Sequence, residues 1–190
     1  MSDQPQAPIP QAKNISVEDM NKADQGDASM EAYKAKLLGG AIGADGKAVA
    51  KYPNDKRKVI VEGVKIVFDD ASAPQKELVL PLNQPDQIVI IKEGVTFTTY
   101  VTFYVQHDIA LGLKVTNTTT KLGIALDTET AMLGSFAPKM EAYVVKAVTN
   151  EAPSGFLGRT TYSFKSVLSD DDLNVHNTFQ CSITVKSDWK

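Results

Sequence analysis

The most constraining feature of this sequence is a strict alternation of side-chain types over ten residues, from Thr96 to Val105. One set of positions carries Phe97, Thr99, Val101, Phe103 and Val105, and every residue of the other set carries a hydroxyl. Alternation with period two indicates a β-strand with one buried face. Such a strand needs paired neighbours and a second layer over its apolar face. The rest of the chain should therefore supply further strands.

Residues 57–190 contain more short runs rich in β-branched and aromatic residues, bounded by turn-forming residues such as Pro74, Pro81 and Pro85. We predict strands there at residues 59–61, 64–68, 78–80, 88–91, 113–118, 123–126, 143–148, 159–168 and 179–186. No segment of helical period lies between them, which argues against a parallel α/β sheet. Many short strands separated by turn signals are typical of an antiparallel β-sandwich. We therefore predict an all-β fold for residues 57–190.

Residues 1–56 follow a different pattern. Prolines among Gln and Ala open the chain, and two short helical patterns follow, one from Ser16 and one from Asp27 to the glycines at 39–40. The second places Met30, Tyr33 and Leu37 on one side. Both are shorter than the ~12–15 residues that an isolated helix needs in water. We predict a flexible, helix-forming N-terminal arm, and we expect the sandwich core to draw nothing from it.

Charge and composition exclude several classes of function. Twenty basic and 23 acidic residues give a net charge of −3, which leaves no basic surplus for a nucleic-acid backbone. A single cysteine and the lack of a signal-peptide pattern indicate a reducing compartment. No apolar run reaches the ~18 residues that would indicate a membrane-spanning helix. We expect a soluble, cytoplasmic protein without nucleic-acid binding or stable membrane insertion.

Signals of catalysis are weak. The glycine-rich stretch at 39–43 lacks the preceding strand of a phosphate-binding loop, and His107 and His176 lie far apart. Cys181 lies within an alternating strand pattern, so we expect a packed thiol. The aspartates at 170–172 lack the spacing of a calcium loop, and a solvated turn is the favoured interpretation of them. We predict no enzyme, no cofactor and no metal site; this architecture suits a binding module.

Several segments together resemble the Rho GDP-dissociation inhibitor family. In the arm, Asp24–Lys34 and the following Leu37–Gly39 are similar to the helix of that family. In the sandwich the similar segments are Lys92–Val95, Met132–Pro138, Glu151–Arg159, Tyr162–Ser166 and Lys186–Lys190. Their order and spacing hold from about residue 16 to the C-terminus. No single motif decides the matter, but so many in register make coincidence improbable.

The resemblance implies an immunoglobulin-like sandwich that holds the geranylgeranyl group of a prenylated Rho/Rac-type small GTPase between its sheets. The arm would form a helical hairpin against the GTPase switch regions. Such a protein, a monomer when free, would inhibit GDP release and extract the GTPase from membranes into the cytosol. The alternative is a general carrier of prenylated or acylated proteins without nucleotide-state effects, which would have little use for the segment Asp27–Leu38. A structural or adhesion sandwich is disfavoured by the missing signal peptide and disulfide.

Site residues follow from the resemblance by position. The prenyl slot would be lined by Ile66, Val89, Phe97, Ile109, Leu113 and Phe179, which could also be ordinary core residues. The GTPase would contact Asp27, Met30, Tyr33, Asp172, Glu141 and Glu151; a helix N-cap and plain surface charge are the competing interpretations of Asp27 and the glutamates. The family commonly has Trp-x-Trp where this chain has Phe179-Gln180-Cys181. These smaller residues predict a wider or differently shaped slot, and they leave the choice between geranylgeranyl and farnesyl open.

Overall fold

The computed structural model describes residues 16, 40–43, 46–82, 84 and 87–190. Nine strands make up its regular structure: β1 (Val59–Phe68), β2 (Glu77–Leu80), β3 (Ile88–Lys92), β4 (Thr96–Val105), β5 (Ala110–Lys121), β6 (Ile124–Phe136), β7 (Tyr143–Glu151), β8 (Thr161–Ser169) and β9 (Val175–Lys186). The helical patterns predicted between residues 16 and 38 lie, apart from Ser16, outside the described residues and stay predictions.

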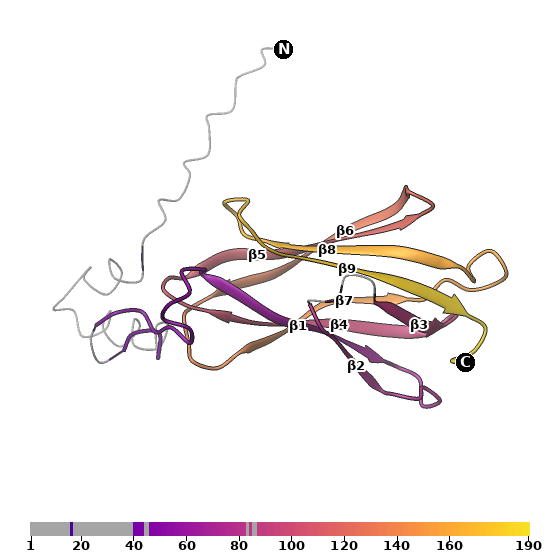
Figure 1. Cartoon of the computed structure of the whole chain (residues 1–190), viewed down its shortest axis with the longest axis horizontal. Helices are drawn as coiled ribbons and strands as arrows, with labels where there is room; N and C mark the ends of the chain where they lie inside the picture. The colour runs from indigo at the N-terminus through magenta and orange to yellow at the C-terminus, as the bar shows by residue number, and fades with distance from the viewer. Residues whose placement is uncertain (1–15, 17–39, 44–45, 83, 85–86) are drawn as a thin grey trace, which may run out of the picture.

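The strands form two sheets packed face to face, as Figure 1 shows. One sheet has the order β2-β1-β4-β7, and the other has the order β3-β9-β8-β5-β6. The predicted all-β sandwich is confirmed. The pairing is antiparallel except in one place, where β3 pairs with β9 in parallel. These two strands lie far apart in the chain, so no hairpin imposes an antiparallel direction on them.

Strand β4 has the alternation predicted for residues 96–105. Its bounds are those predicted, and it lies between β1 and β7 in the four-stranded sheet. Thr99, Val101, Phe103 and Val105 point inward and are buried, while Phe97 is half-buried. A central strand with one face on the core produces this alternation most clearly, since both of its neighbours are within the sheet.

The hairpin of β5 and β6 is longer than predicted. The sequence indicated strands at 113–118 and 123–126, whereas the pairing extends from Ala110 opposite Phe136 to Lys121 opposite Ile124. Strand β6 is an edge strand whose residues are almost all exposed or half-buried, so it has no hydrophobic alternation to read. Its backbone pairing with β5, rather than its side chains, gives it its length.

The core consists of two large apolar clusters with a polar boundary. One contains Ile66, Phe68, Val89, Ile91 and Phe179, and the other contains Val101, Phe103, Leu113, Val115 and Leu168. Between them, the inward positions of β4 and β5 carry the buried polar side chains of Thr99 and Asn117. Within the described part of the chain the Asn117 Oδ1 atom has no hydrogen-bond partner. Two polar side chains therefore lie between the two apolar clusters of the sandwich interior.

The segment before β1 packs onto the sandwich, contrary to expectation. Ala41 is fully buried and contacts Ile109 and Ala137, which belong to the sandwich. The buried Gln106 side chain accepts a hydrogen bond from the Tyr52 backbone N–H at 2.9 Å and donates one to the Asp55 carbonyl at 2.7 Å. Packing of the sandwich therefore does draw on residues of the predicted arm. The segment is rich in Gly and Ala and has no periodicity, so its sequence gave no sign of this attachment.

Candidate functional site

A cavity of about 340 Å³ lies between the two sheets, and we call it the inter-sheet cavity. The four-stranded sheet and the loop after it contribute one wall, and strands of the five-stranded sheet contribute the other. The lining residues are Ile91, Phe97, Thr99, Thr119, Leu126, Asp127, Val148, Asn150, Glu151, Ala152, Pro153, Tyr162, Phe164, Ile183 and Val185. Both volume and lining, mostly apolar with a few polar groups, are those of a small-molecule site.

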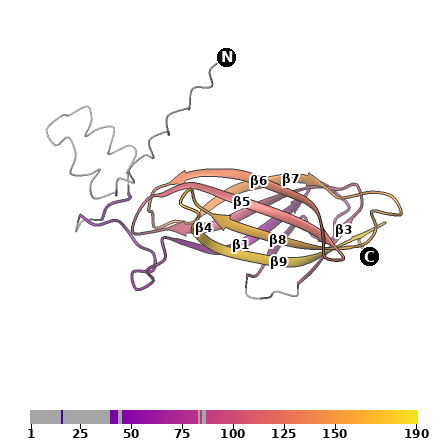
Figure 2. The same ribbon diagram turned by 90° about the horizontal axis from the view of Figure 1, so that it is seen from above.

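Strands β6 and β7 are the two edge strands on one side of the sandwich (Figure 2), and both contribute residues to the lining of the inter-sheet cavity. Between Thr119 and Thr120 the pairing with β6 passes from Asp127 to Ala125, so Leu126 is the extra residue of a bulge. Bulges re-aim side chains, and here Leu126 and Asp127 both line the cavity. Glu151 at the end of β7 adds a second carboxylate. The cavity thus combines an apolar interior with an acidic rim.

One wall of the cavity continues into the loop between β7 and β8, residues 152–160. The Glu93 carboxylate anchors this loop, accepting hydrogen bonds from the Gly155 N–H at 2.7 Å and from the Arg159 guanidinium at 2.6 and 3.0 Å. These bonds hold the pKa of Glu93 below its ordinary value. Tyr162 lines the cavity and donates its hydroxyl to the Gly158 carbonyl at 3.0 Å. The loop is therefore fixed at both ends.

The six residues predicted to line the slot lie in different places. Phe97 lines the inter-sheet cavity. Ile66, Val89 and Phe179 lie in the core cluster that shares Ile91, Phe97, Phe164 and Ile183 with the cavity lining, so they back its wall. Leu113 belongs to the second cluster, and Ile109 packs on Ala41. The structure thus brings four of the six together and leaves two apart.

Sequence reasoning missed most of the lining. Phe164 and Ile183 occupy predicted strands, and their alternation with polar neighbours could have indicated that they point inward. Leu126 could not have been found in this way, because a bulge interrupts the alternation. Val148 is buried as well, although Val144 and Lys146 at the same parity of β7 are exposed; a register shift opposite Thr99 and Tyr100 turns it inward.

The predicted contacts with a GTPase also separate. Asp27, Met30 and Tyr33 lie outside the described residues. Asp172 is exposed in the turn between β8 and β9, and Glu141 is exposed in the connection between β6 and β7. Glu151 lies at the far end of β7 from Glu141, beside the cavity. The three sandwich carboxylates therefore do not form one patch.

The turn that carries Asp172 is built around Asp170, which is 3% exposed. Its carboxylate accepts hydrogen bonds from the Asn174 backbone N–H at 2.8 Å and side-chain amide at 3.0 Å, and His176 Nε2 lies 3.0 Å away. Burial acts to raise the pKa of Asp170, but these partners outweigh it and lower the pKa. The solvated-turn interpretation fits the exposed Asp171 and Asp172 and is wrong for Asp170.

The family model that matches this chain describes "RHO protein GDP dissociation inhibitor", and the match covers residues 2–188. The chain belongs to this family. Rho GDP-dissociation inhibitor 1 of Homo sapiens is 34% identical over 92% of this chain and 83% of its own length. A Dictyostelium discoideum relative with the same family name is 35% identical over 94% of this chain and 90% of its own. The Rho GDP-dissociation inhibitor of Schizosaccharomyces pombe is 28% identical over 96% and 88%.

Phe179 and Cys181 stand where the sequence comparison above expects the two Trp of a Trp-x-Trp pattern. Both residues are smaller than Trp, and both are buried. Phe179 and Cys181 lie in the core cluster behind the inter-sheet cavity, and the next inward residues of β9, Ile183 and Val185, line the cavity itself. Burial raises the pKa of the Cys181 thiol to about 12, so it stays protonated. The expectation of a packed thiol is confirmed.

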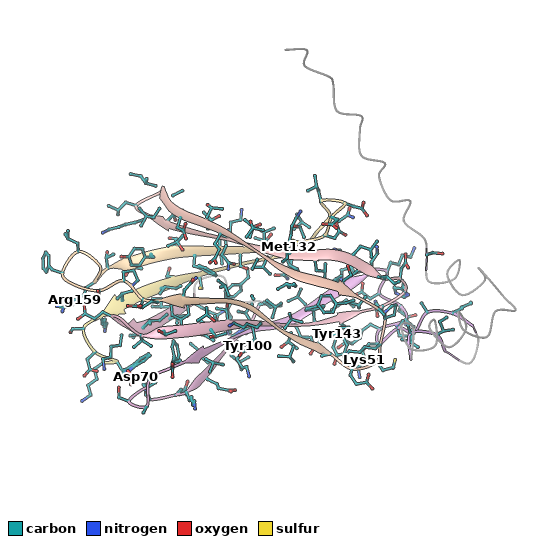
Figure 3. All side chains as sticks on the ribbon, turned by 180° about the vertical axis from the view of Figure 1, so that it is seen from behind. Lys51, Asp70, Tyr100, Met132, Tyr143 and Arg159 are labelled. Carbon is teal, nitrogen blue, oxygen red and sulfur yellow. The ribbon has the colours of Figure 1, made fainter. Side chains whose placement is uncertain are left out.

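At the end of the sandwich that holds the cavity, the C-terminal residues pack against the edge opposite the cavity. The Trp189 indole N–H donates to Asp70 Oδ2 at 3.0 Å, and its ring meets Phe68 edge-to-face at a centroid distance of 5.0 Å. Figure 3 shows Asp70 and Arg159 at this end and Tyr143 and Lys51 at the other. Lys92 Nζ lies 3.4 Å from the same Asp70 oxygen.

In the described part of the chain, no helix is long and apolar enough to cross a membrane.

Proposed function

We propose that this protein binds a prenylated Rho-family GTPase, inhibits its release of GDP and extracts it from membranes, with the geranylgeranyl group in the inter-sheet cavity. The observation that carries the proposal is an apolar cavity between the sheets of a chain that belongs to the Rho GDP-dissociation inhibitor family. We further propose that the protein acts without catalysis, as a cytoplasmic monomer when free.

The energetics of the lipid fit such a cavity. A geranylgeranyl chain has twenty carbons, and burial is worth ~0.8 kcal/mol per methylene, so leaving the bilayer costs on the order of 10 kcal/mol. A carrier must return a comparable free energy from its own apolar surface. Phe97, Phe164 and Ile183 offer that surface, backed by the core cluster that contains Ile66, Val89 and Phe179. Leu113 and Ile109 would be reached only by a lipid that extends past Thr99 and Asn117.

The acidic rim suits the basic tail expected to precede a prenylated cysteine. Asp127 and Glu151 line the inter-sheet cavity from β6 and β7. Exposed ion pairs contribute only ~0–1 kcal/mol each, so these carboxylates orient the tail more than they hold it. Asp172 and Glu141, in connections between strands, would contact the folded part of the GTPase.

Nucleotide-state effects are assigned to the arm. Asp27, Met30 and Tyr33 share one side of the predicted helix, with the carboxylate at its N-terminal end. A segment that orders only on binding loses ~2–5 kcal/mol of its gross interaction free energy, which keeps the complex reversible. Once ordered on the switch regions, it would restrain the motions through which GDP escapes.

A charge placed in the inter-sheet cavity tests the proposal. Leu126 lines the cavity and is 56% exposed, so Leu126→Asp should fold; Val144 on β7 is 58% exposed and lies outside the lining, so Val144→Asp is its matched control. A carboxylate desolvated by the lipid should weaken binding of the prenylated GTPase by about tenfold or more. The control should not change it.

The same titration with a GTPase that lacks its lipid decides the broader point. We expect the unaltered protein to bind the prenylated form far more tightly. Equal affinity for the two forms would contradict lipid binding, whatever the arm contributes. Tight binding of the prenylated form without any slowing of GDP release would instead support a general lipid carrier.

A further inference from the structure

Four large apolar side chains protrude from two loops at the cavity end of the sandwich, and we call them the apolar tip. Leu122 is 94% exposed and Ile124 is 69% exposed in the β5–β6 hairpin, while Phe156 and Leu157 are 86% and 81% exposed in the β7–β8 loop. The loops meet where Lys121 Nζ lies 3.5 Å from the Leu157 carbonyl oxygen. Contiguous exposed apolar surface marks an interaction site.

The conformation of Leu122 strengthens this inference. Its φ is +50°, and Gly123 follows at +81°, so both residues of the hairpin turn are left-handed. Asn-Gly is the preferred pair in such a turn, because a bulky side chain is disfavoured at positive φ. Leucine is therefore unfavourable here both for the backbone and for its exposure. Leu173 has a similar conformation in the β8–β9 turn, so the gathering of four exposed apolar side chains, and not the backbone of Leu122 alone, supports a role outside the fold.

The apolar tip is held firmly next to the inter-sheet cavity. Leu126, two residues after Ile124, lines the cavity, and so do Ala152 and Pro153 at the start of the β7–β8 loop. The Glu93 carboxylate fixes that loop through Gly155 and Arg159, on either side of the exposed pair. Figure 1 shows both loops at the end of the sandwich opposite residues 46–58. The tip therefore projects from the mouth of the lipid site and not from its interior.

We propose that the apolar tip inserts into the interfacial region of a lipid bilayer and so brings the cavity mouth to the membrane. This rests on the proposed function, because a prenyl group must be collected from the bilayer. Protruding apolar side chains on loop ends match an interface that has no fixed shape, whereas a protein partner requires complementary packing. Lys121, at the base of the tip, can reach a lipid phosphate, and Phe156 suits the headgroup boundary.

Co-sedimentation of the full chain with neutral phosphatidylcholine vesicles tests the proposal. The double change Phe156→Ser, Leu157→Ser should reduce the vesicle-bound fraction about tenfold. Leu122→Asn should reduce it severalfold and, because Asn tolerates positive φ, should also raise Tm. A residue that served only the fold would not combine a higher Tm with weaker vesicle binding.

Leu173 provides a matched control. It is 75% exposed with φ +63° in the β8–β9 turn, at the opposite end of the sandwich. Leu173→Asn should raise Tm in the same way and leave vesicle binding unchanged. Absence of vesicle binding by the unaltered protein, or equal loss in the Leu173 variant, would overturn the proposal.

A second measurement separates this proposal from the proposed function. Affinity for a geranylgeranylated peptide free in solution should be the same in the tip variants and the unaltered protein, while extraction of a prenylated GTPase from vesicles should be slower in the variants. If the unaltered protein did not bind the geranylgeranylated peptide, the proposed lipid binding in the cavity would be refuted, whatever the result with vesicles. Weaker binding of a vesicle-free prenylated GTPase by the tip variants would show a protein contact and overturn membrane insertion.

Discussion

Arg159 and Glu93 form a two-bond ion pair that joins the β7–β8 loop to the turn between β3 and β4. Arg159 Nη2 lies 2.6 Å from Glu93 Oε1, and Nε lies 3.0 Å from Oε2. The residues are separated by 66 positions in the sequence, and between them they hold one wall of the inter-sheet cavity. The pair therefore links the order of a surface loop to the shape of the inter-sheet cavity.

Breaking this pair should loosen the cavity wall. With Arg159→Ala we expect faster amide hydrogen exchange over residues 153–159 and several-fold weaker binding of a prenylated peptide. We expect little change in Tm, because the Arg159 side chain is 43% exposed and ion pairs at the surface contribute only ~0–1 kcal/mol. Arg159→Lys keeps the charge but cannot make two parallel bonds, so its exchange should be intermediate. Unchanged exchange in the alanine variant would mean that the Arg159 bonds do not anchor the loop and that the Gly155 N–H bond to Glu93 is sufficient.

Among the described residues, the buried Oδ1 atom of Asn117 has no hydrogen-bond partner, and this predicts a stabilising substitution. Leaving a buried polar atom unsatisfied costs about 1–3 kcal/mol, and leucine has a similar shape without that requirement. Asn117→Leu should therefore raise Tm by roughly 2–12 °C, since 1 kcal/mol corresponds to about 2–4 °C in a chain of this size. Differential scanning calorimetry measures the change. A lower Tm would show that the amide has a partner, such as water, in solution.

The turn around Asp170 predicts a dependence of stability on pH. The pKa of Asp170 is lower in the folded protein than its ordinary value, so its stabilising contribution is present above about pH 4 and is lost as pH falls through the folded pKa. Asp170→Asn cannot ionise and should have a lower Tm at pH 6. The difference in Tm from the unaltered protein should shrink toward pH 3. A difference that stays constant with pH would rule out the ionised carboxylate as its source.

The sequence predicted the fold better than it predicted its edges. Strand β4 was predictable to the residue because one face lies on the core and the other does not. Strand β6 was not, because an exposed edge strand carries no alternation and its length depends on pairing with β5. The parallel pairing of β3 with β9 depends on how the whole chain is arranged, which no local pattern encodes.

The lining of the inter-sheet cavity was likewise only partly predictable from local sequence patterns. Phe97 was identified because the resemblance placed it on the inward face of a clear strand. Leu126 was missed because a bulge turns it inward, and the anchor between Glu93 and Arg159 joins residues with no local relationship. Ile109 was predicted from the resemblance alone, yet it lies just before β5 and packs on Ala41. Tertiary contacts, rather than periodicity, decided these positions.

Two deletions separate the contribution of the arm from that of the segment packed on the sandwich. Removing residues 1–39 deletes Asp27, Met30 and Tyr33 but keeps Ala41 and the Gln106 hydrogen bonds. We expect this form to keep its Tm and its affinity for a prenylated peptide. It should lose most of its inhibition of GDP release from a prenylated Rho-type GTPase, measured with a fluorescent nucleotide.

Removing residues 1–56 should have a further effect on the fold itself. Gln106 is fully buried, and this deletion takes away the Tyr52 N–H and the Asp55 carbonyl while leaving only the Arg57 carbonyl, 3.0 Å from its Nε2. Each unsatisfied buried group costs about 1–3 kcal/mol, so Tm should fall by several degrees relative to the shorter deletion. Equal Tm values for the two forms would show that residues 40–56 add nothing to the sandwich. If the form that lacks residues 1–39 inhibited GDP release fully, the contacts that inhibit release would lie on the sandwich, at Asp172 and Glu141, and not on the arm.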